Sequence, residues 1–467
     1  MTVERRHQPV LRRLSVAGFF ALLAFGVVGS ARAQSGNPSS AANPFFGSVT
    51  LQPATDELLK LSLDDAIQRG LENNLGLREA ENGQKLLQGE KNEALQQFLP
   101  TLTLTGDTGV YQHNLAALGF SPAVAAKFGS LRPPGISGAF TPITRDDLTE
   151  GQIHFEQTLF SGPVIAGWKA AGAAERVAYY ARMSAEGDVI QQVAEDQLAL
   201  EHAREAHQAG TVANLDVLRA QVELQAQQQA EIAAENNLDK DLILLKRETG
   251  IAPGQKIELT DRAPYSDLAL QTPDEVRAIA YKSRQDYQNL QNQVVEYRAV
   301  RSAYRSERLP SLSFKGYYGV STVNGAGTHG NFAVFGTLSV PIFREARLRG
   351  DIDAAQAELN AANAKLDDLR ERIDEQVRDA LMDVATTAKL VDVARSDVDM
   401  ARQALSDETD RVNAGVDSNL PLVTAQATLA SAQNNLVESL YQYNVAKLGL
   451  ARAAGVLQTQ YRAYLGR

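Results

Sequence analysis

The chain contains one long motif twice. Residues 210–221 read GTVANLDVLRAQ, and residues 415–426 read GVDSNLPLVTAQ, so every matched position is shifted by the 205 residues between Gly210 and Gly415. Each copy is followed by a long helical pattern rich in Ala, Gln and Leu, which ends at Gly250 or at Gly455. A repeat at a fixed spacing indicates duplicated architecture.

Shorter matches extend the duplication upstream. Residues 99–106 read LPTLTLTG and residues 309–316 read LPSLSFKG, while Phe160 and Gly167 correspond to Phe343 and Gly350. Each half therefore predicts a helix, a strand, a loop, a strand, a very long helix, a tight turn and a long helix. The first repeat is predicted at 61–250, with strands at about 99–111 and 151–161. An equatorial linker at 251–272 follows it. The second repeat is predicted at 273–456, with strands at about 309–322 and 331–343, and a C-terminal tail at 457–467 ends the chain.

Residues 1–33 have the features of a secretory signal peptide. Arginines at 5, 6, 12 and 13 precede the apolar residues 14–28, and Ala31-Arg32-Ala33 is a small-x-small cleavage site. An uncleaved anchor helix is the alternative, although the apolar stretch is short for a membrane span. Residues 34–60 are predicted to form an N-terminal arm that is flexible or wraps the surface.

Charge and cysteine content exclude several classes of protein. The formal charge is -10, and it becomes about -14 without the first 33 residues, which hold five Arg and one Glu. Lys and Arg are scattered with no basic stripe, so nucleic-acid binding is not expected. The absence of cysteine excludes disulfides, thiolate metal sites, cysteine nucleophiles and lipidation of an N-terminal cysteine.

The predicted strands alternate between apolar and polar or small residues. Leu102 and Leu104 alternate with threonines, Ile153 and Phe155 with polar residues, and the even-numbered positions from 332 to 342 are mostly apolar. This pattern fits transmembrane β-strands with a wet interior, and it equally fits a half-buried sheet in a soluble domain. Because the smallest transmembrane barrels have about eight strands, a barrel built from four strands per chain requires several copies of the chain.

The helix predicted after Gly350 has a heptad pattern. Ile352, Leu359, Leu366 and Ile373 follow one another at seven-residue steps, and the pattern continues to residue 412. Residues 344–413 contain no proline, so one helix here reaches about 100 Å. The pattern predicts a coiled coil, in which helices pack side by side in a wall. The alternative is a plain intramolecular or dimeric coiled coil.

The two copies of the motif are predicted to be tips of helical hairpins. Glycine favours a helix C-terminus, and asparagine favours the start of the next helix. Asp216 and Pro421 suit a first helical turn by charge and by fixed φ. The residues that would form a gate at these tips are Gly210, Asn214, Leu215, Asp216, Gly415, Asn419, Leu420 and Pro421.

These features together resemble the TolC-type outer-membrane efflux and secretion channel family. The resemblance is carried by the two tip motifs, by the two Leu-Pro strand starts, and by LSLDDAI at 61–67 before NNL at 73–75. It implies a mixed α and transmembrane β fold, in which a homotrimer forms a twelve-stranded barrel in the outer membrane and a long periplasmic α-helical coiled-coil tunnel. It also implies a passive channel in a tripartite efflux pump or type I secretion system, gated at the tips, whose partners are a periplasmic adaptor and an inner-membrane pump or exporter. The alternative is a periplasmic coiled-coil scaffold without a pore.

Two features depart from the family pattern. Many members carry acidic residues just inside the second tip, where this chain has Pro421 and Thr424. The first descending helix is also short, with 43 residues from Gly167 to Gly210 against 65 from Gly350 to Gly415. The missing 22 residues correspond to about 33 Å of helix.

No catalytic, metal or cofactor site is predicted, so the chain is not expected to be an enzyme. His202 and His207 are five residues apart, which does not place both rings on one helix face. Residues 325–330 (GAGTHG) match a dinucleotide glycine pattern, but a strand follows them, so they predict a hairpin loop.

Overall fold

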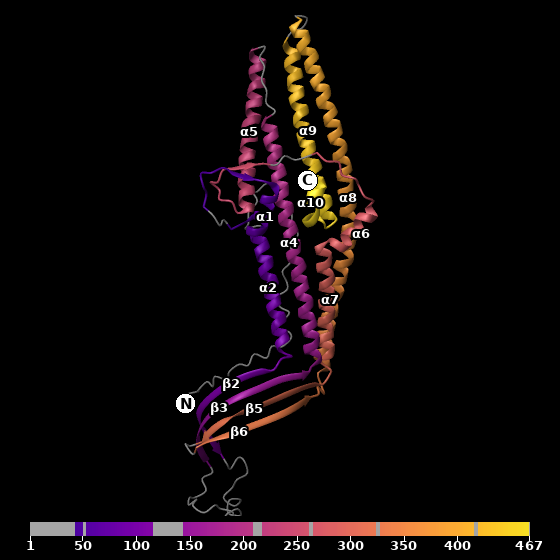
Figure 1. The fold of residues 1–467 in the computed structure, drawn as a ribbon. Helices are drawn as coiled ribbons and strands as arrows, with labels where there is room; N and C mark the ends of the chain where they lie inside the picture. Colours follow the sequence, from indigo (N-terminus) through magenta and orange to yellow (C-terminus); the bar gives the residue numbers. More distant parts are fainter. Residues whose placement is uncertain are drawn as a thin grey trace, which may run out of the picture. The chain divides into compact units, whose positions relative to one another are not determined.

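The computed structural model describes residues 43–49, 53–114, 143–208, 217–260, 265–323, 327–414 and 419–466. The predicted signal segment lies outside the described residues, as do residues 34–42 of the predicted arm. The described residues belong to one unit, which is mostly helical and includes one four-stranded sheet (Figure 1).

The duplication is visible in the helices that open each half. The first half begins with α1 (Leu63–Asn73) and α2 (Leu75–Gln96), and the second begins with α6 (Pro273–Ser283) and α7 (Gln285–Ser306). The two pairs have identical lengths of 11 and 22 residues. Both α1 and α6 begin with a capping box, in which the side chain of Ser62 or Thr272 accepts from the third backbone N–H of the helix.

Four antiparallel strands form the sheet, in the order β2-β3-β5-β6. They are β2 (Thr101–Asn114), β3 (Ile143–Phe160), β5 (Ser311–Val323) and β6 (Thr328–Ser339). The loop expected at 112–150 is therefore too long, because residues 143–150 pair with β2 although they lack apolar alternation. β6 ends earlier than expected, since Pro341 has no N–H to donate to a neighbouring strand.

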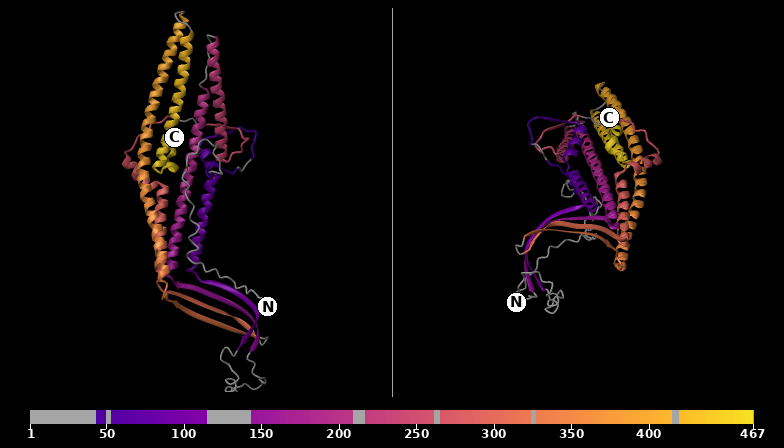
Figure 2. Two further views of the ribbon diagram at one scale, coloured as in Figure 1. Left: turned by 180° about the vertical axis from the view of Figure 1, so that it is seen from behind. Right: turned by 60° about the horizontal axis from the view of Figure 1, so that its bottom comes forward.

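Two pairs of long helices follow the strands. The first half contains α4 (Gly162–Gln208) and α5 (Val217–Thr249), and the second contains α8 (Glu345–Asn413) and α9 (Asn419–Ala453). The residues at the predicted heptad positions of α8, from Ala355 to Val398, are buried. In Figures 1 and 2 the α8–α9 pair extends beyond the α4–α5 pair.

Each returning helix ends against the start of a helix from the same half. Gly250 follows α5 with φ 71°, and a Cβ atom placed on it would lie 2.8 Å from Cβ of Asn73. Gly455 follows α9 with φ 72°, and a Cβ atom there would lie 2.6 Å from the backbone nitrogen of Arg284. Both positions therefore require glycine, for its left-handed conformation and for the close approach. As a result each returning helix ends where the two opening helices of its half meet.

The level at which these helix ends meet, near Gly250 and Gly455, is called the helix junction. The linker and the chain ends wrap around it. Strand β1 (Leu59–Leu61) pairs in parallel with β4 (Ile257–Leu259) of the linker. Further along, Tyr443 of α9 accepts a hydrogen bond from the backbone N–H of Leu268. The segment expected as a C-terminal tail contains helix α10 (Leu457–Leu465), whose first and last residues are buried.

Candidate functional site

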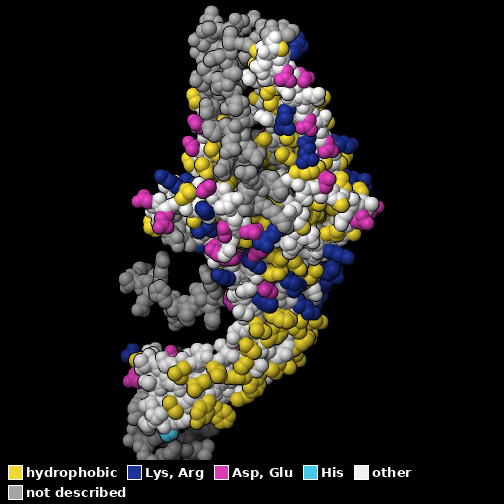
Figure 3. Space-filling model, turned by 45° about the horizontal axis from the view of Figure 1, so that its top comes forward, with side chains coloured by type: hydrophobic (Ala, Val, Ile, Leu, Met, Phe, Trp, Pro, Cys, Tyr) yellow, Lys and Arg dark blue, Asp and Glu magenta, His cyan; other side chains and the backbone are white. Residues whose placement is uncertain are grey.

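One face of the sheet is apolar and exposed. Strand pairing aligns Leu104 with Ile153, then with Tyr318 and Phe332, so these four side chains form one row across the sheet. Leu104 is 77% exposed and Phe332 is 73% exposed, although both are large and apolar. Other exposed apolar residues of this face are Leu102, Val110, Leu312, Phe314, Val320, Val334 and Leu338. Figure 3 shows hydrophobic side chains spread over the sheet. An apolar surface of this extent indicates contact with lipid or protein.

A row of threonines limits the apolar face on the side away from the helices. Thr108, Thr149, Thr322 and Thr328 are aligned across the four strands. Their hydroxyls lie 3.0 Å apart in the first pair and 2.9 Å apart in the last pair. Beyond this row the same face carries Arg145, which donates to Gln112. The apolar face is thus a band with a polar outer edge.

The opposite face of the sheet carries polar and charged side chains, together with Phe335, which is 56% exposed. Glu156 pairs with Lys315 on the neighbouring strand. In the next row, the Nε2 atom of His154 lies 3.1 Å from the hydroxyl of Thr105, and its ring lies 5.6 Å from the ring of Tyr317. The alternation expected from the sequence therefore separates apolar from polar side chains, and the sheet has one face suited to lipid and one suited to water.

The sheet has two open edges. Among the described residues, β2 pairs only with β3, and β6 pairs only with β5. Each edge presents backbone N–H and C=O groups along 14 residues of β2 or 12 residues of β6. An exposed edge of this length is a template for pairing with another strand.

Of the predicted gate residues, three lie in the described part of the chain. Gly210, Asn214, Leu215, Asp216 and Gly415 lie outside the described residues. Asn419, Leu420 and Pro421 form the first turn of α9. Proline is tolerated there because the first N–H groups of a helix have no intrahelical acceptor.

Three further predicted features have a clear place in the structure. Of the glycine-rich residues, Thr328 to Gly330 belong to β6, which pairs antiparallel with β5, so the hairpin reading is confirmed for the described residues. His202 and His207 belong to α4. The difference in length between the descending helices is also real, with 47 residues in α4 and 69 in α8.

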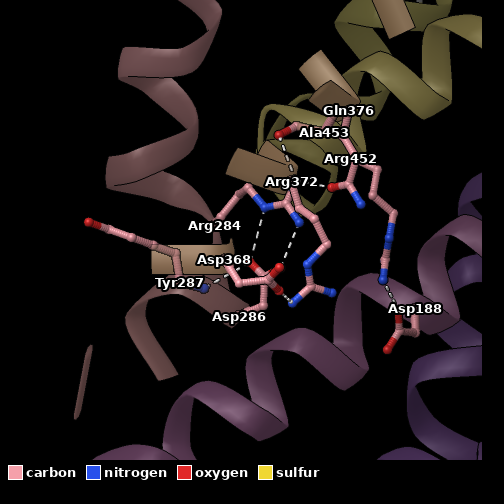
Figure 4. A network of polar contacts seen from close by, with 9 residues as sticks. All are labelled: Asp188, Arg284, Asp286, Tyr287, Asp368, Arg372, Gln376, Arg452 and Ala453. Atoms are coloured by element: carbon pink, nitrogen blue, oxygen red, sulfur yellow. Dashed lines mark hydrogen bonds and ion pairs between the residues drawn. The ribbon is translucent and has the colours of Figure 1, made fainter. Parts of the chain in front are cut away.

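A polar network joins the two halves at the helix junction (Figure 4). Arg284, at the start of α7, donates to both carboxylate oxygens of Asp286 at 3.0 and 2.6 Å, and to the side chain of Gln376 on α8 at 2.7 Å. It also donates to the carbonyl oxygen of Ala453 at the end of α9. Arg452 of α9 forms an ion pair with Asp188 of α4. Four helices are therefore held together at one level.

The two carboxylates of this network respond differently to burial. Desolvation alone would raise the pKa of Asp286, but the hydrogen bonds and charge of Arg284 outweigh it and hold the pKa below its usual value. For Asp188 desolvation is the larger effect, so its pKa is raised although Arg452 opposes the shift. Sequence reasoning missed this network, because its members are more than 90 residues apart in pairs such as Arg284 and Gln376.

Cavities in the described part of the chain lie beside the helix ends at the junction. Two cavities at the junction have volumes of about 210 and 240 Å³, below the size range typical of pockets for small molecules. The described residues contain no group of His, Asp and Glu side chains that could hold a metal ion.

No helix in the described ranges is long and apolar enough to span a membrane.

Comparison with known proteins places these features in a family context. Residues 277–456 match the family described as outer membrane efflux protein. The chain is 28% identical to the alkaline protease secretion protein AprF of Pseudomonas aeruginosa over 259 residues, and 25% identical to the solvent efflux pump outer membrane protein SrpC of Pseudomonas putida over 254 residues. Each match covers 53% of this chain and 53% of the relative, so the chain spans about half the length of these relatives.

Solved structures with the same fold cover almost the whole chain. The Campylobacter jejuni CmeC outer membrane channel has a TM-score of 0.66 at 15% identity, and the match covers 89% of this chain and 92% of that one. The Neisseria gonorrhoeae MtrE channel in its open state has a TM-score of 0.66 at 17% identity, with 91% and 98% covered. The resemblance to TolC-type channels is therefore confirmed, and the fold is that of outer membrane efflux channels.

Proposed function

We propose that this chain, which resembles the outer membrane efflux proteins in sequence and in fold, is a passive outer-membrane channel. Three copies would contribute four strands each to a twelve-stranded barrel, and their long helices would form a tunnel in the periplasm. The chain would perform no chemistry, and energy for transport would come from an inner-membrane pump or exporter that is reached through a periplasmic adaptor.

The observation that carries this proposal is the two-faced sheet with open edges. From Thr328 to Leu338 the strand rises about 34 Å, or about 26 Å along the membrane normal at a tilt of 40°. This height is close to the apolar band of about 25 Å in outer-membrane barrels. A soluble coiled-coil scaffold gives no reason for Leu104 and Phe332 to remain exposed, so the channel is favoured over that alternative.

Edge pairing between copies supports the trimer and can be tested by cysteine cross-linking. The chain has no cysteine, so introduced pairs react without background. Within one chain the edge strands β2 and β6 are separated by two strands, which puts them about 14 Å apart, too far for a disulfide. A bond between them must therefore join two copies.

In the test, Thr103→Cys on β2 is combined with Asn331→Cys, Ala333→Cys or Phe335→Cys on β6. All four positions are on the polar face, so one combination should give covalent dimers and trimers after oxidation. Thr103→Cys with Phe332→Cys is the control, because these two side chains point to opposite faces and should not react. If all three combinations give monomers and no covalent dimers or trimers, the barrel arrangement is ruled out.

The gate is proposed at the hairpin tips, at Gly210, Asn214, Leu215, Asp216, Gly415, Asn419, Leu420 and Pro421. Opening would be a rearrangement of these tips that the partner biases. Gly415→Ala should impair export while the protein still reaches the outer membrane as a trimer, because alanine disfavours a left-handed helix end. Normal export by this variant would argue against a gate at this tip.

The proposed organisation keeps the boundaries expected from the sequence. Residues 1–33 would direct export and be removed, 34–60 would form the arm, and 251–272 would belong to the equatorial region between the repeats at 61–250 and 273–456. The cargo is left open, since the relatives carry names as different as alkaline protease secretion and solvent efflux.

A further inference from the structure

Arginines gather where the second repeat passes from helix to sheet. Residues 298–309 and 340–351, at the end of α7 and around the start of α8, contain seven arginines and three carboxylates, a local charge of +4 in a chain of charge -10. This group is called the arginine belt, and its members are Arg298, Arg301, Arg305, Arg308, Arg344, Arg347 and Arg349. Figure 3 shows dark blue side chains along the boundary between the helices and the sheet. The expectation of no basic stripe was therefore wrong. Arg298, Arg301 and Arg305 follow a helical spacing on α7, Arg308 lies just beyond its end, and the fold brings the other three arginines beside them.

Ion pairs hold the two parts of the belt together. Arg308 donates to Glu345 at 2.7 Å, and Arg347 pairs with Glu307. Arg349 shares Glu345 at 2.9 Å. Glu307 and Glu345 thus join the end of α7 to the start of α8, while Asp351 pairs with Arg347 within α8.

Three arginines of the belt remain without an acidic partner. Among the described residues, no carboxylate forms an ion pair with Arg298, Arg305 or Arg344, and all three side chains are exposed. Beside Arg344, Ile342 is 95% exposed and Phe343 is 91% exposed. Free guanidinium groups next to bare apolar side chains match a lipid, which offers a phosphate and acyl chains together.

The first repeat differs at the equivalent positions. Residues 88–99 contain one lysine and two glutamates, and residues 157–168 contain no charged side chain. This part instead carries Trp168, which is 39% exposed and packs edge-on against Phe98. Tryptophan is enriched at membrane–water interfaces. The boundary between helices and sheet therefore carries an interfacial residue in both repeats, Trp168 in the first and the arginines of the belt in the second.

We propose that the arginine belt binds the headgroup phosphates of anionic phospholipid in the membrane leaflet nearer the helices. The inference rests on the proposed insertion of the sheet in a membrane. Arg305 and Arg344 bind the phosphate, and Ile342 and Phe343 contact the acyl chains. Because only the second repeat carries the belt, each copy in the assembly binds lipid at one side and not at the other.

The test uses the full mature chain, purified in detergent and titrated with phosphatidylglycerol or phosphatidylcholine, with bound lipid counted by native mass spectrometry. Each basic residue near an anionic surface changes affinity by about fivefold. The double variant Arg305→Gln/Arg344→Gln should therefore lose about 25-fold in affinity for phosphatidylglycerol and little for phosphatidylcholine. Arg344→Lys should retain most of the preference.

Arg402→Gln is the matched control, since Arg402 is an exposed arginine on α8 outside the belt. Equal binding of the two lipids by the wild type, or an equal loss in Arg402→Gln, would overturn the proposal. So would weaker trimers without a change in lipid preference, because the arginines would then pair with a neighbouring copy. Conductance in planar bilayers is measured on the same samples. A conducting protein without lipid preference refutes only the belt, whereas a protein that neither inserts nor conducts refutes the channel.

Discussion

The sharpest prediction uses two neighbouring residues of β6 that face opposite sides of the sheet. Phe332 lies in the middle of the apolar band, aligned with Tyr318, and Ala333 lies on the polar face, aligned with Tyr317. Phe332→Arg should prevent stable insertion, and Ala333→Arg should leave it intact. An arginine on the lipid face of an outer-membrane barrel costs about 2–4 kcal/mol at the bilayer midplane. In a trimer the change occurs three times, so the total is about 6–12 kcal/mol.

The assay measures where the two variants go and whether they assemble. Membranes are fractionated, and unheated samples are run on denaturing gels to separate the trimer from the monomer. Folding into lipid vesicles in a urea series then gives the difference in stability directly. The reasoning would be refuted if both variants formed trimers in the outer membrane equally well, or if Ala333→Arg were the more damaging change.

Three further predictions concern the helices. Burial, with a smaller contribution from Glu358, raises the pKa of Glu296 to about 7 from 4.5, so between these pH values the folded state holds a proton that the unfolded state has released, and the free energy of unfolding falls as the pH rises. Glu296→Gln should remove this fall and raise the free energy of unfolding above pH 7 by about 3 kcal/mol. Thermal melts at pH 5 and pH 8 would detect the difference. Gly455→Ala should lower the free energy of unfolding by about 1–2 kcal/mol or more, because φ is 72° at this position. Gly449→Ala is the control, since this glycine lies in an open helical position and its replacement should be neutral or stabilising. Equal melting temperatures of the two variants would contradict the close packing at the junction. Ile373→Ala, at a fully buried seam position of α8, should cost about 2–5 kcal/mol in chemical unfolding, and a loss below 1 kcal/mol would show that the seam is loosely packed.

Periodic features of this fold could be predicted from sequence, since a local pattern carries them. The seven-residue step of Leu359, Leu366 and Ile373 identifies the buried seam of α8, and all three are buried. The alternation around Leu104 and Phe332 identifies the apolar face, because successive side chains of a strand point to opposite sides. The two halves were also recognisable, since duplication leaves a fixed offset.

Features that depend on pairing between distant segments could not be predicted in the same way. The outer half of β3 carries polar residues, and it is a strand because β2 provides backbone partners, which leaves no pattern in the sequence. Gly250 and Gly455 could be recognised as helix ends, but nothing local indicates that Asn73 and Arg284 lie against them. The arginine belt was missed for the same reason, since four of its arginines lie at and just after the end of α7 and three lie around the start of α8.

The helix junction explains where the difference between the descending helices arises. Asp188 of α4 and Gln376 of α8 both take part in the junction network, and α4 continues for 20 residues past Asp188, to Gln208, while α8 continues for 37 past Gln376, to Asn413. The returning helices are nearly equal, with 33 residues in α5 and 35 in α9. In the second half the descending and returning segments therefore match in length, and the seam of α8 is buried from Val377 to Ala401. In the first half the descending segment is 13 residues shorter than its partner, or about 20 Å. Most of the missing length thus lies on the side of the junction away from the sheet, while the helices α2 and α7 that lead to the sheet have the same length of 22 residues.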